Sequence, residues 1–290
     1  MVASHVTIDR TARYVVIICA SASFVILGAI FIFTLREGYP AFQQIGLINF
    51  LFGTEWRPGQ EMFGILPMAV GSLLVTLGAM VLAIPIGLAC AILLAEIASH
   101  RVRRILRPAV ELLVGIPSVV YGLVGMMVVV PLVRQIGGTG FSVLAASLVL
   151  MAMVLPTIIS ISEDSLRAVP KGYKEAALAM GATQWQTIWH VQIPAARSGI
   201  MAGIVLGMGR AIGETMAMIM VIGNAVVIPS SPLSPARTLT GNIAVEIMYA
   251  AGLHRNALFA TGVILFLVIL ILNTVATIAL RKGIRTQGVA

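Results

Sequence analysis

Six long apolar runs, separated by shorter polar stretches, dominate the pattern of this chain. Each run is about 20 residues or longer, the length that an α-helix needs to cross roughly 30 Å of hydrocarbon at about 1.5 Å per residue. The pattern therefore predicts an all-α, polytopic membrane protein with six transmembrane helices. The expected spans are residues 14–35, 66–95, 110–133, 141–161, 198–228 and 257–280.

The basic residues predict how these helices are oriented. Four arginines crowd the short polar stretch 100–107, and further basic residues flank both ends of the chain. Because Lys and Arg gather on the cytoplasmic side of membrane proteins, both termini, this stretch and residues 163–197 are expected in the cytoplasm. Residues 36–65 and 229–256 are then expected outside, the first lying against the lipid headgroups with Trp56.

Composition excludes several other classes. Mean hydropathy is +1.02 and only 10% of the 290 residues are charged, whereas charge makes up about a quarter of a soluble domain. The formal net charge of +8 suggests nucleic acid at first sight, but the basic residues stand at helix ends rather than along a groove with aromatics. Cys19 and Cys90 lie inside apolar runs without a His or carboxylate at ligand spacing, so we expect packing roles and no metal site.

The longest polar interruption of the membrane-embedded region, residues 163–197, has a helical pattern of its own. Residues 171–180 predict a short helix that begins after Pro170 and stops at Gly181. A helix exposed in the cytoplasm and ended by a glycine favours a docking element, although an ordinary surface helix is the alternative.

A second short helix is expected directly afterwards. Thr183 and Gln186 match a capping box, and an apolar face of two tryptophans around Ile188 is expected to pack onto the ends of the membrane helices. Pro194 is expected to end this helix.

Two opposite charges stand inside the fifth apolar run. Arg210 and Glu214 are four residues apart, one helical turn, and are expected on the same face of the helix; Thr215 follows. A charge in the bilayer centre costs about 2.5–3.5 kcal/mol, so we expect both to face the bundle interior, either paired or lining an aqueous path. The rigid fork of Arg210 suits phosphate or carboxylate oxygens, and an ion pair that only fixes helix packing is the alternative.

The polar region resembles a known family. Glu175-Ala176-Ala177, Gly181 and the run Val191-Gln192-Ile193-Pro194 resemble the EAA signature of ABC importer permeases, with aliphatic replacements at two positions. The resemblance implies the type I permease fold and a coupling helix seated on a nucleotide-binding subunit. It makes Glu175, Ala176, Ala177, Gly181 and Pro194 the expected ATPase-coupling residues. Since this chain has no Walker A sequence, ATP and Mg²⁺ are expected on a separate ATPase, and no enzymatic activity is expected here.

The charged stretch narrows the resemblance. Gly209-Arg210-Ala211-Ile212-Gly213-Glu214-Thr215, together with residues 115–122 and 234–240, resembles the PstC-type permeases of phosphate importers. This implies a translocation pathway at Arg210, Glu214 and Thr215. It also implies three partners, namely a second permease of PstA type, an ATPase dimer of PstB type and an external phosphate-binding protein of PstS type.

Three alternatives stay open at this point. A permease for sulfate, molybdate or phosphonate is the nearest. A membrane enzyme would use Glu214 with His190 or His254, which are expected on opposite faces of the membrane, and a passive channel or structural protein would copurify with no ATPase. For organisation, we expect residues 1–65 to form a tail, the first transmembrane helix and an external segment, and residues 66–290 to form the core permease domain with the coupling loop 163–197.

Overall fold

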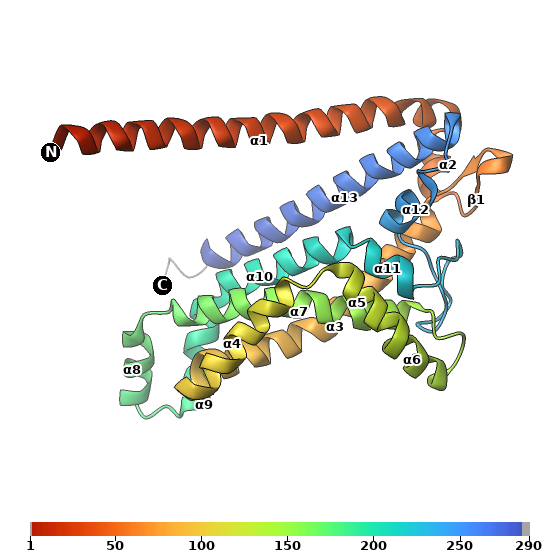
Figure 1. The fold of residues 1–290 in the computed structure, drawn as a ribbon. Helices are drawn as coiled ribbons and strands as arrows, with labels where there is room; N and C mark the ends of the chain where they lie inside the picture. The colour runs from red at the N-terminus through yellow and green to blue at the C-terminus, as the bar shows by residue number, and fades with distance from the viewer. Residues whose placement is uncertain (1, 286–290) are drawn as a thin grey trace.

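The computed structural model describes residues 2–285 as an elongated bundle of helices (Figure 1). One end of the bundle carries α8 (Lys171–Ala179) and α9 (Gln184–Thr187), and we call it the α8 end. The other, the hairpin end, carries α2 (Leu47–Phe52), the two-stranded hairpin and α12 (Leu239–Glu246). The start of α1 and the end of α13 both lie at the α8 end.

Within the described residues, six helices are long and apolar enough to cross a membrane, which confirms the expected number. They are Arg13–Ile45, Leu66–Ile97, Ser118–Ile136, Val143–Arg167, Gln184–Gly213 and Gly252–Val275.

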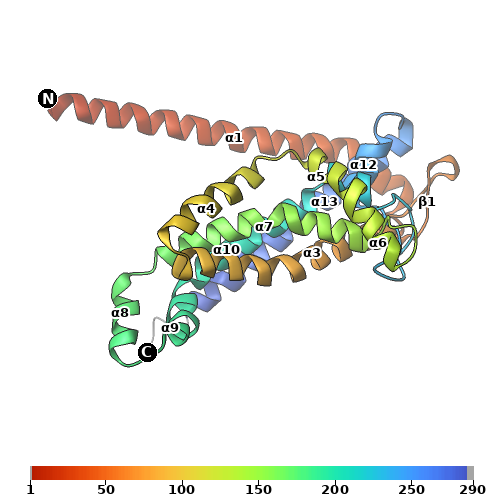
Figure 2. The same cartoon turned by 60° about the horizontal axis from the view of Figure 1, so that its bottom comes forward.

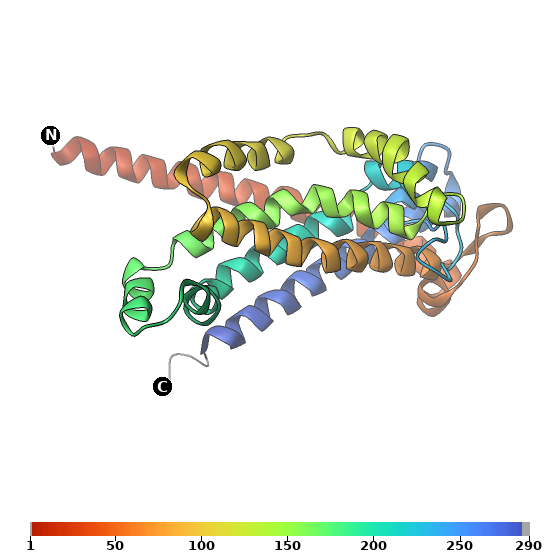
Figure 3. The ribbon, with the colours of Figure 1, turned by 90° about the horizontal axis from the view of Figure 1, so that it is seen from below.

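The centre of the bundle is formed by α3 (Leu66–Ile92), α7 (Val143–Arg167) and α10 (Ile193–Gly213), which run side by side (Figures 1 and 3). Small residues let these helices approach closely. A side chain added at Gly87 or at Gly207 would meet Ile158 of α7 at 2.8 or 3.1 Å. Because lipid tails are as apolar as the helix surfaces, such close packing is what holds membrane helices together.

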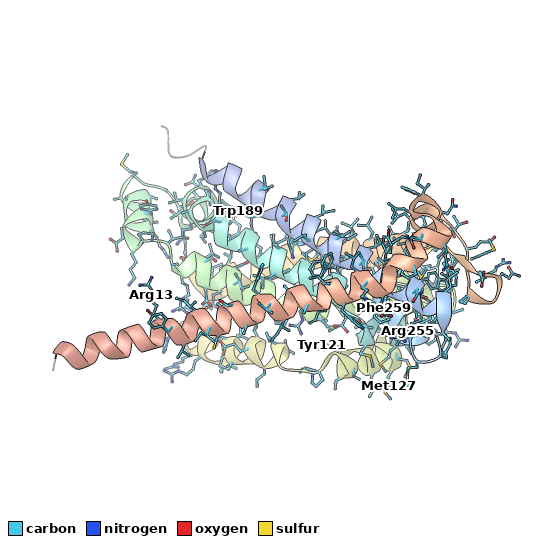
Figure 4. The ribbon with its side chains drawn as sticks, turned by 90° about the horizontal axis from the view of Figure 1, so that it is seen from above. Arg13, Tyr121, Met127, Trp189, Arg255 and Phe259 are labelled. Atoms are coloured by element: carbon cyan, nitrogen blue, oxygen red, sulfur yellow. The ribbon has the colours of Figure 1, made fainter. Side chains whose placement is uncertain are left out.

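Helix α1 (Val2–Ile45) lies on the outside of the bundle, as Figures 1 and 2 show, and packs against α13 (Gly252–Arg285) toward the hairpin end, whereas its first half diverges from α13 (Figure 1). Gly38 permits the closest contact, since a Cβ there would lie 2.7 Å from the backbone nitrogen of Ala260. Arg255 of α13 lies over the Phe259 ring at 5.5 Å (Figure 4). The helix runs ten residues beyond the span expected from hydropathy, so residues 36–45 belong to α1 and not to an external loop.

The third span is broken, and the expectation of one helix over 110–133 is wrong. Helix α4 (His100–Val114) contains the arginine-rich stretch that was expected to be a loop, and it ends at Gly115. A new helix then begins at Ser118 and continues through α5 (Ser118–Val124), the π-helix η3 (Gly125–Val129) and α6 (Val130–Ile136). Pro117 explains the break, because proline lacks an N–H and disfavours helical backbone at the residue before it.

The fifth span also differs from its expected bounds of 198–228. It starts at Gln184, passes through the π-helix η4 (Ile188–Gln192) into α10, and stops at Gly213; α11 (Met216–Val221) follows after a break. The expectation that Pro194 ends the second short helix is therefore wrong. Pro194 lies in the first turn of α10, where a widened π-turn precedes it and a missing N–H is tolerated.

At the hairpin end, β1 (Trp56–Arg57) pairs antiparallel with β2 (Met62–Phe63). Trp56 was expected to lie against lipid headgroups, but it is buried with Phe63 at the edge of a core that includes Phe50 and Met68. Within residues 229–256, which were expected on the external side of the membrane, α12 contributes Leu239 to this core.

Candidate docking helix and translocation site

The end of α8 has the geometry that its sequence predicts. Gly181 has φ +85°, a left-handed conformation that glycine adopts without strain. Its N–H donates to the carbonyl of Leu178 at 3.0 Å, and the N–H of Ala182 donates to Ala177 at 3.1 Å. These two bonds form a Schellman motif, which turns the chain sharply after α8.

The signature residues occupy the surface of this helix. Glu175 and Ala176 are exposed, and Ala177 is half-buried. The capping box after them is present, since Gln186 N–H donates to Thr183 Oγ1 at 3.2 Å and the Gln186 amide oxygen accepts from Thr183 N–H at 2.8 Å. The two short helices thus form a rigid projection at the α8 end.

The tryptophan face does not pack as expected. Ile188 is buried, but Trp185 and Trp189 remain 57% and 46% exposed and contact each other edge to face at 5.9 Å; Figure 4 labels Trp189 at the α8 end of the bundle. For Trp189 helix geometry accounts for the difference, because the π-turn that starts at Ile188 rotates the residues after it away from a regular helical face.

An ion-pair network joins α4 to the end of α7. Glu163, expected at the start of a polar loop, lies inside α7 and is only 2% exposed. Arg107 of α4 binds Asp164 at 2.9 Å and approaches Glu163 at 3.6 Å. The pKa of Arg107 is raised above its ordinary value, first by the hydrogen bond to Glu111 and further by the attraction of Asp164 and Glu163. Arg107 therefore stays charged and keeps α4 attached to α7.

Arg210 and Glu214 are not paired, and the expectation that they share a helix face is wrong. Glu214 ends α10 with extended backbone at φ −68° and ψ 129°. Its Oε1 accepts hydrogen bonds from the N–H groups of Thr215 and Ala217 at 3.1 and 3.2 Å. The carboxylate therefore caps the positive N-terminal end of α11, and the two side chains are separated by the break.

Arg210 stays half-buried in the last turn of α10 and, among the residues that the structure describes, forms no ion pair. Tyr121 of α5 (labelled in Figure 4) is near enough to interact with it electrostatically, and the Tyr121 hydroxyl donates to the carbonyl of Leu113 at 2.9 Å. Sequence reasoning did not single out Tyr121, since only the tertiary structure brings spans three and five together.

The helices after the two breaks pack against each other. A Cβ at Gly122 of α5 would lie 2.9 Å from the Cα of Ala217 in α11, so only glycine permits this contact. Because α5 begins at Ser118 and α11 at Met216, both helix starts lie on the same side of this contact. Arg210 precedes one of them by less than two turns.

Helix α12 supports the second break from the hairpin end. Thr240 Oγ1 donates to the carbonyl of Glu214 at 3.0 Å, and Leu239 N–H donates to Ser72 Oγ of α3 at 2.9 Å. A cavity of about 10 Å³, bordered by Ser72, Thr76 and Glu214, remains between these groups. The hairpin end is thereby connected to α3 and to the Glu214 break.

A buried charge cluster holds α12 in place, and sequence reasoning missed it. Glu246 accepts hydrogen bonds from Arg237 at 2.6 Å and from Trp56 Nε1 at 2.7 Å, and it lies 2.8 Å from His254 Nε2. Arg237 also donates to Asn242 Oδ1 and to the Asn224 carbonyl, both at 2.9 Å. The cluster ties the hairpin, α12 and α13 together, over distances that no local pattern encodes.

The bundle has six spans, and two of the apolar runs are broken inside it. A helical projection stands at the α8 end, where α1 starts and α13 ends. Together these features define a membrane transport subunit. Solved structures share this fold. A bacterial alginate ABC transporter, crystallised with an alginate-bound periplasmic protein, matches with a TM-score of 0.62 at 16% identity, covering 90% of this chain and 92% of that one. An inward-facing MetNI methionine ABC transporter matches at 0.59 and 22% identity, covering 79% and 99%.

Sequence comparison identifies the family. Residues 83–285 match the model of the binding-protein-dependent transport system inner membrane component, and the chain belongs to this family of ABC transporter permeases, multi-pass proteins of the inner membrane. It is not itself catalytic, and ATP is used on a separate ATPase.

Curated relatives are similar over nearly the whole chain. The probable ABC transporter permease protein YqgH of Bacillus subtilis is 42% identical over 90% of this chain and 88% of its own length. The phosphate transport system permease proteins PstC of Xylella fastidiosa and Pasteurella multocida are 35% and 32% identical, over 97% and 98% of this chain and 94% and 95% of theirs. These matches confirm the resemblance to PstC-type permeases.

Proposed function

We propose that this chain is the PstC-type permease subunit of an ATP-driven importer of inorganic phosphate. It forms half of the translocation pathway together with a second permease of PstA type. A PstB-type ATPase dimer binds at the α8 end and hydrolyses ATP with Mg²⁺, and a PstS-type binding protein delivers phosphate at the hairpin end. Both chain ends are then cytoplasmic, in agreement with the positive-inside bias, and residues 66–290 act as the core permease domain.

The state of Arg210 carries the phosphate proposal. A guanidinium inside a membrane span is costly and is kept where it serves a pathway. Glu214 is turned to the N-terminus of α11, so the fork of Arg210 is available for two phosphate oxygens. Broken membrane helices are a recurring place for substrate sites in transporters. In this proposal Glu214 and Thr215 shape the pathway by holding the break, and Arg210 meets the anion.

Coupling follows from the arrangement of the α8 end. Glu175, Ala176, Ala177 and Gly181 present a short, sharply ended helix to the ATPase, and Pro194 lies where the second short helix passes into α10. Since α10 ends beside Arg210, one continuous span of about 45 Å at about 1.5 Å per residue links the docking region to the pathway.

Phosphate uptake by an Arg210→Gln variant tests the proposal. In cells that depend on this importer, we expect uptake to fall at least about tenfold, the effect of losing one charge-assisted contact of about 1.4 kcal/mol. Arg36→Gln is the matched control, because Arg36 is exposed on α1, outside both proposed docking ends. Wild-type uptake by Arg210→Gln, at normal protein level in the membrane, contradicts the role of Arg210.

The alternative cargo is another oxyanion such as sulfate, molybdate or phosphonate, since an arginine fork also accepts these. Binding of each anion to the purified external binding protein, with competition in uptake, separates the cases. Copurification of the ATPase and the second permease with this chain tests the partners.

A further inference from the structure

The cytoplasmic extension of α3 is a five-residue π-helix, η2 (Leu93–Ile97), and it receives contacts from three other elements. The central one is an ion pair between Lys174 Nζ of α8 and Glu96 Oε2 at 2.5 Å. The Glu96 side chain is only 8% exposed and that of Lys174 34% exposed. Because the Glu96 side chain is buried, this pair is less screened by salt than a fully exposed salt bridge.

The backbone of η2 is held as well. Gln184 of α9 donates to the Glu96 carbonyl at 3.4 Å. Arg103 of α4 donates to the carbonyls of Leu94 and Ala95, the second at 2.9 Å. Carbonyl groups at a helix C-terminus lack intrahelical partners and carry negative potential, so cationic side chains are favourable there. Only the Lys174 contact, however, links η2 to the docking helix through an opposite charge.

The other end of α3 reaches the region around Glu214. Ser72 of α3 accepts the N–H of Leu239, and a Cβ at Gly71 would lie 2.5 Å from the carbonyl oxygen of Arg237. These residues begin α12, whose Thr240 bonds to Glu214. Helix α3 therefore connects α8 at one end of the bundle with the Glu214 break nearer the other end.

We propose that the Glu96–Lys174 ion pair is a positioning link that passes movement of the docking helix α8 to span α3, in addition to the covalent route through α10. The inference rests on the proposed coupling role of α8. An ion pair transmits displacement in both directions because separating the charges costs energy. Because η2 continues α3 without a break in the helical backbone, a displacement of Glu96 is passed on to α3. Glu96 and Lys174 touch no substrate; they act through α3.

Charge reversal in the complete complex, reconstituted in vesicles, tests this link. The measured quantity is the number of phosphate ions imported per ATP hydrolysed. For Lys174→Glu and for Glu96→Lys we expect this ratio to fall about fivefold or more, the lower range of a coupling interaction. We expect the double variant, with the charges exchanged, to return to within about twofold of wild type. Arg101→Glu is the matched control, since Arg101 lies exposed on α4, outside the docking helix, and forms no ion pair among the described residues.

Neutral variants guard against misfolding. Glu96→Gln keeps the shape of the carboxylate and Lys174→Gln removes the ammonium group. Both are expected to lower the same ratio while copurification with the ATPase stays unchanged, which shows that the folded chain is present. The inference is overturned if both neutral variants keep the wild-type ratio, or if the exchanged double variant is no better than the single reversals. A wild-type complex that imports another oxyanion instead of phosphate overturns only the cargo proposal, and the ratio is then measured with that anion.

Discussion

Replacing Glu246 is the sharpest test of how the hairpin end is held. This carboxylate, 8% exposed, has three partners within 2.8 Å, namely Arg237, Trp56 and His254. In Glu246→Gln the amide keeps the shape but offers one oxygen and one NH₂ group. If the oxygen accepts from Arg237, the NH₂ group faces the Trp56 N–H and that hydrogen bond is lost.

The magnitude follows from these contacts. A hydrogen bond to a charged group contributes about 1.5–3 kcal/mol, and the attraction to Arg237 is reduced at the same time. We therefore expect Glu246→Gln to lower the free energy of unfolding by about 2–4 kcal/mol. Glu246→Ala should cost about 3–5 kcal/mol, because it leaves the Arg237 charge, only 15% exposed, without its carboxylate.

Unfolding of the purified protein by SDS titration in mixed micelles measures this loss. Glu55→Gln is the control, since Glu55 is 45% exposed and approaches Arg57 only at 3.4 Å; we expect its effect to stay within about 0.5 kcal/mol. Equal stabilities of Glu246→Gln and Glu55→Gln would refute the reasoning, because the buried cluster would then contribute nothing net.

Two glycines give further predictions. Gly181→Val places a branched side chain at φ +85°, which costs about 1–2 kcal/mol and disrupts the end of α8. In reconstituted complexes we expect this variant to hydrolyse ATP without matching uptake. Gly172→Val is the milder control, because Gly172 lies in open space on the same helix. Unchanged coupling in Gly181→Val would count against α8 as the coupling element. Gly38→Val brings a side chain to 2.7 Å from Ala260 N and should destabilise the α1–α13 contact by about 1–3 kcal/mol, measured by SDS titration. Gly28→Val should leave the stability unchanged, because nothing lies within 4 Å of a Cβ at Gly28. Equal losses of stability in the two variants would disprove the close-packing argument.

The α8 region was predictable because its signals are local. Gly181 ends α8 through backbone preference, and Thr183 with Gln186 caps the next helix through side chains three residues apart. The number of spans was predictable for a similar reason, since a run of apolar residues reports membrane crossing whatever it packs against.

The places where local reasoning failed are breaks and long-range contacts. Hydropathy averages over a window, so it does not register that Pro117 and Glu214 interrupt two apolar runs. The prediction that Arg210 and Glu214 share a helix face assumed an unbroken helix. Because the helix breaks at Glu214, its carboxylate accepts from the first N–H groups of α11 instead.

The sequence by itself determined the class of protein, the number of spans and the presence of the short helix α8, because hydrophobic length, helix caps and the signature residues act within a few turns of the chain. Only the tertiary structure decided which charges meet. Trp56 donates a hydrogen bond to Glu246, 190 residues further along the chain, and Lys174 pairs with Glu96, from which 78 residues separate it. Such pairs depend on how the helices pack, and packing is a property of the whole bundle.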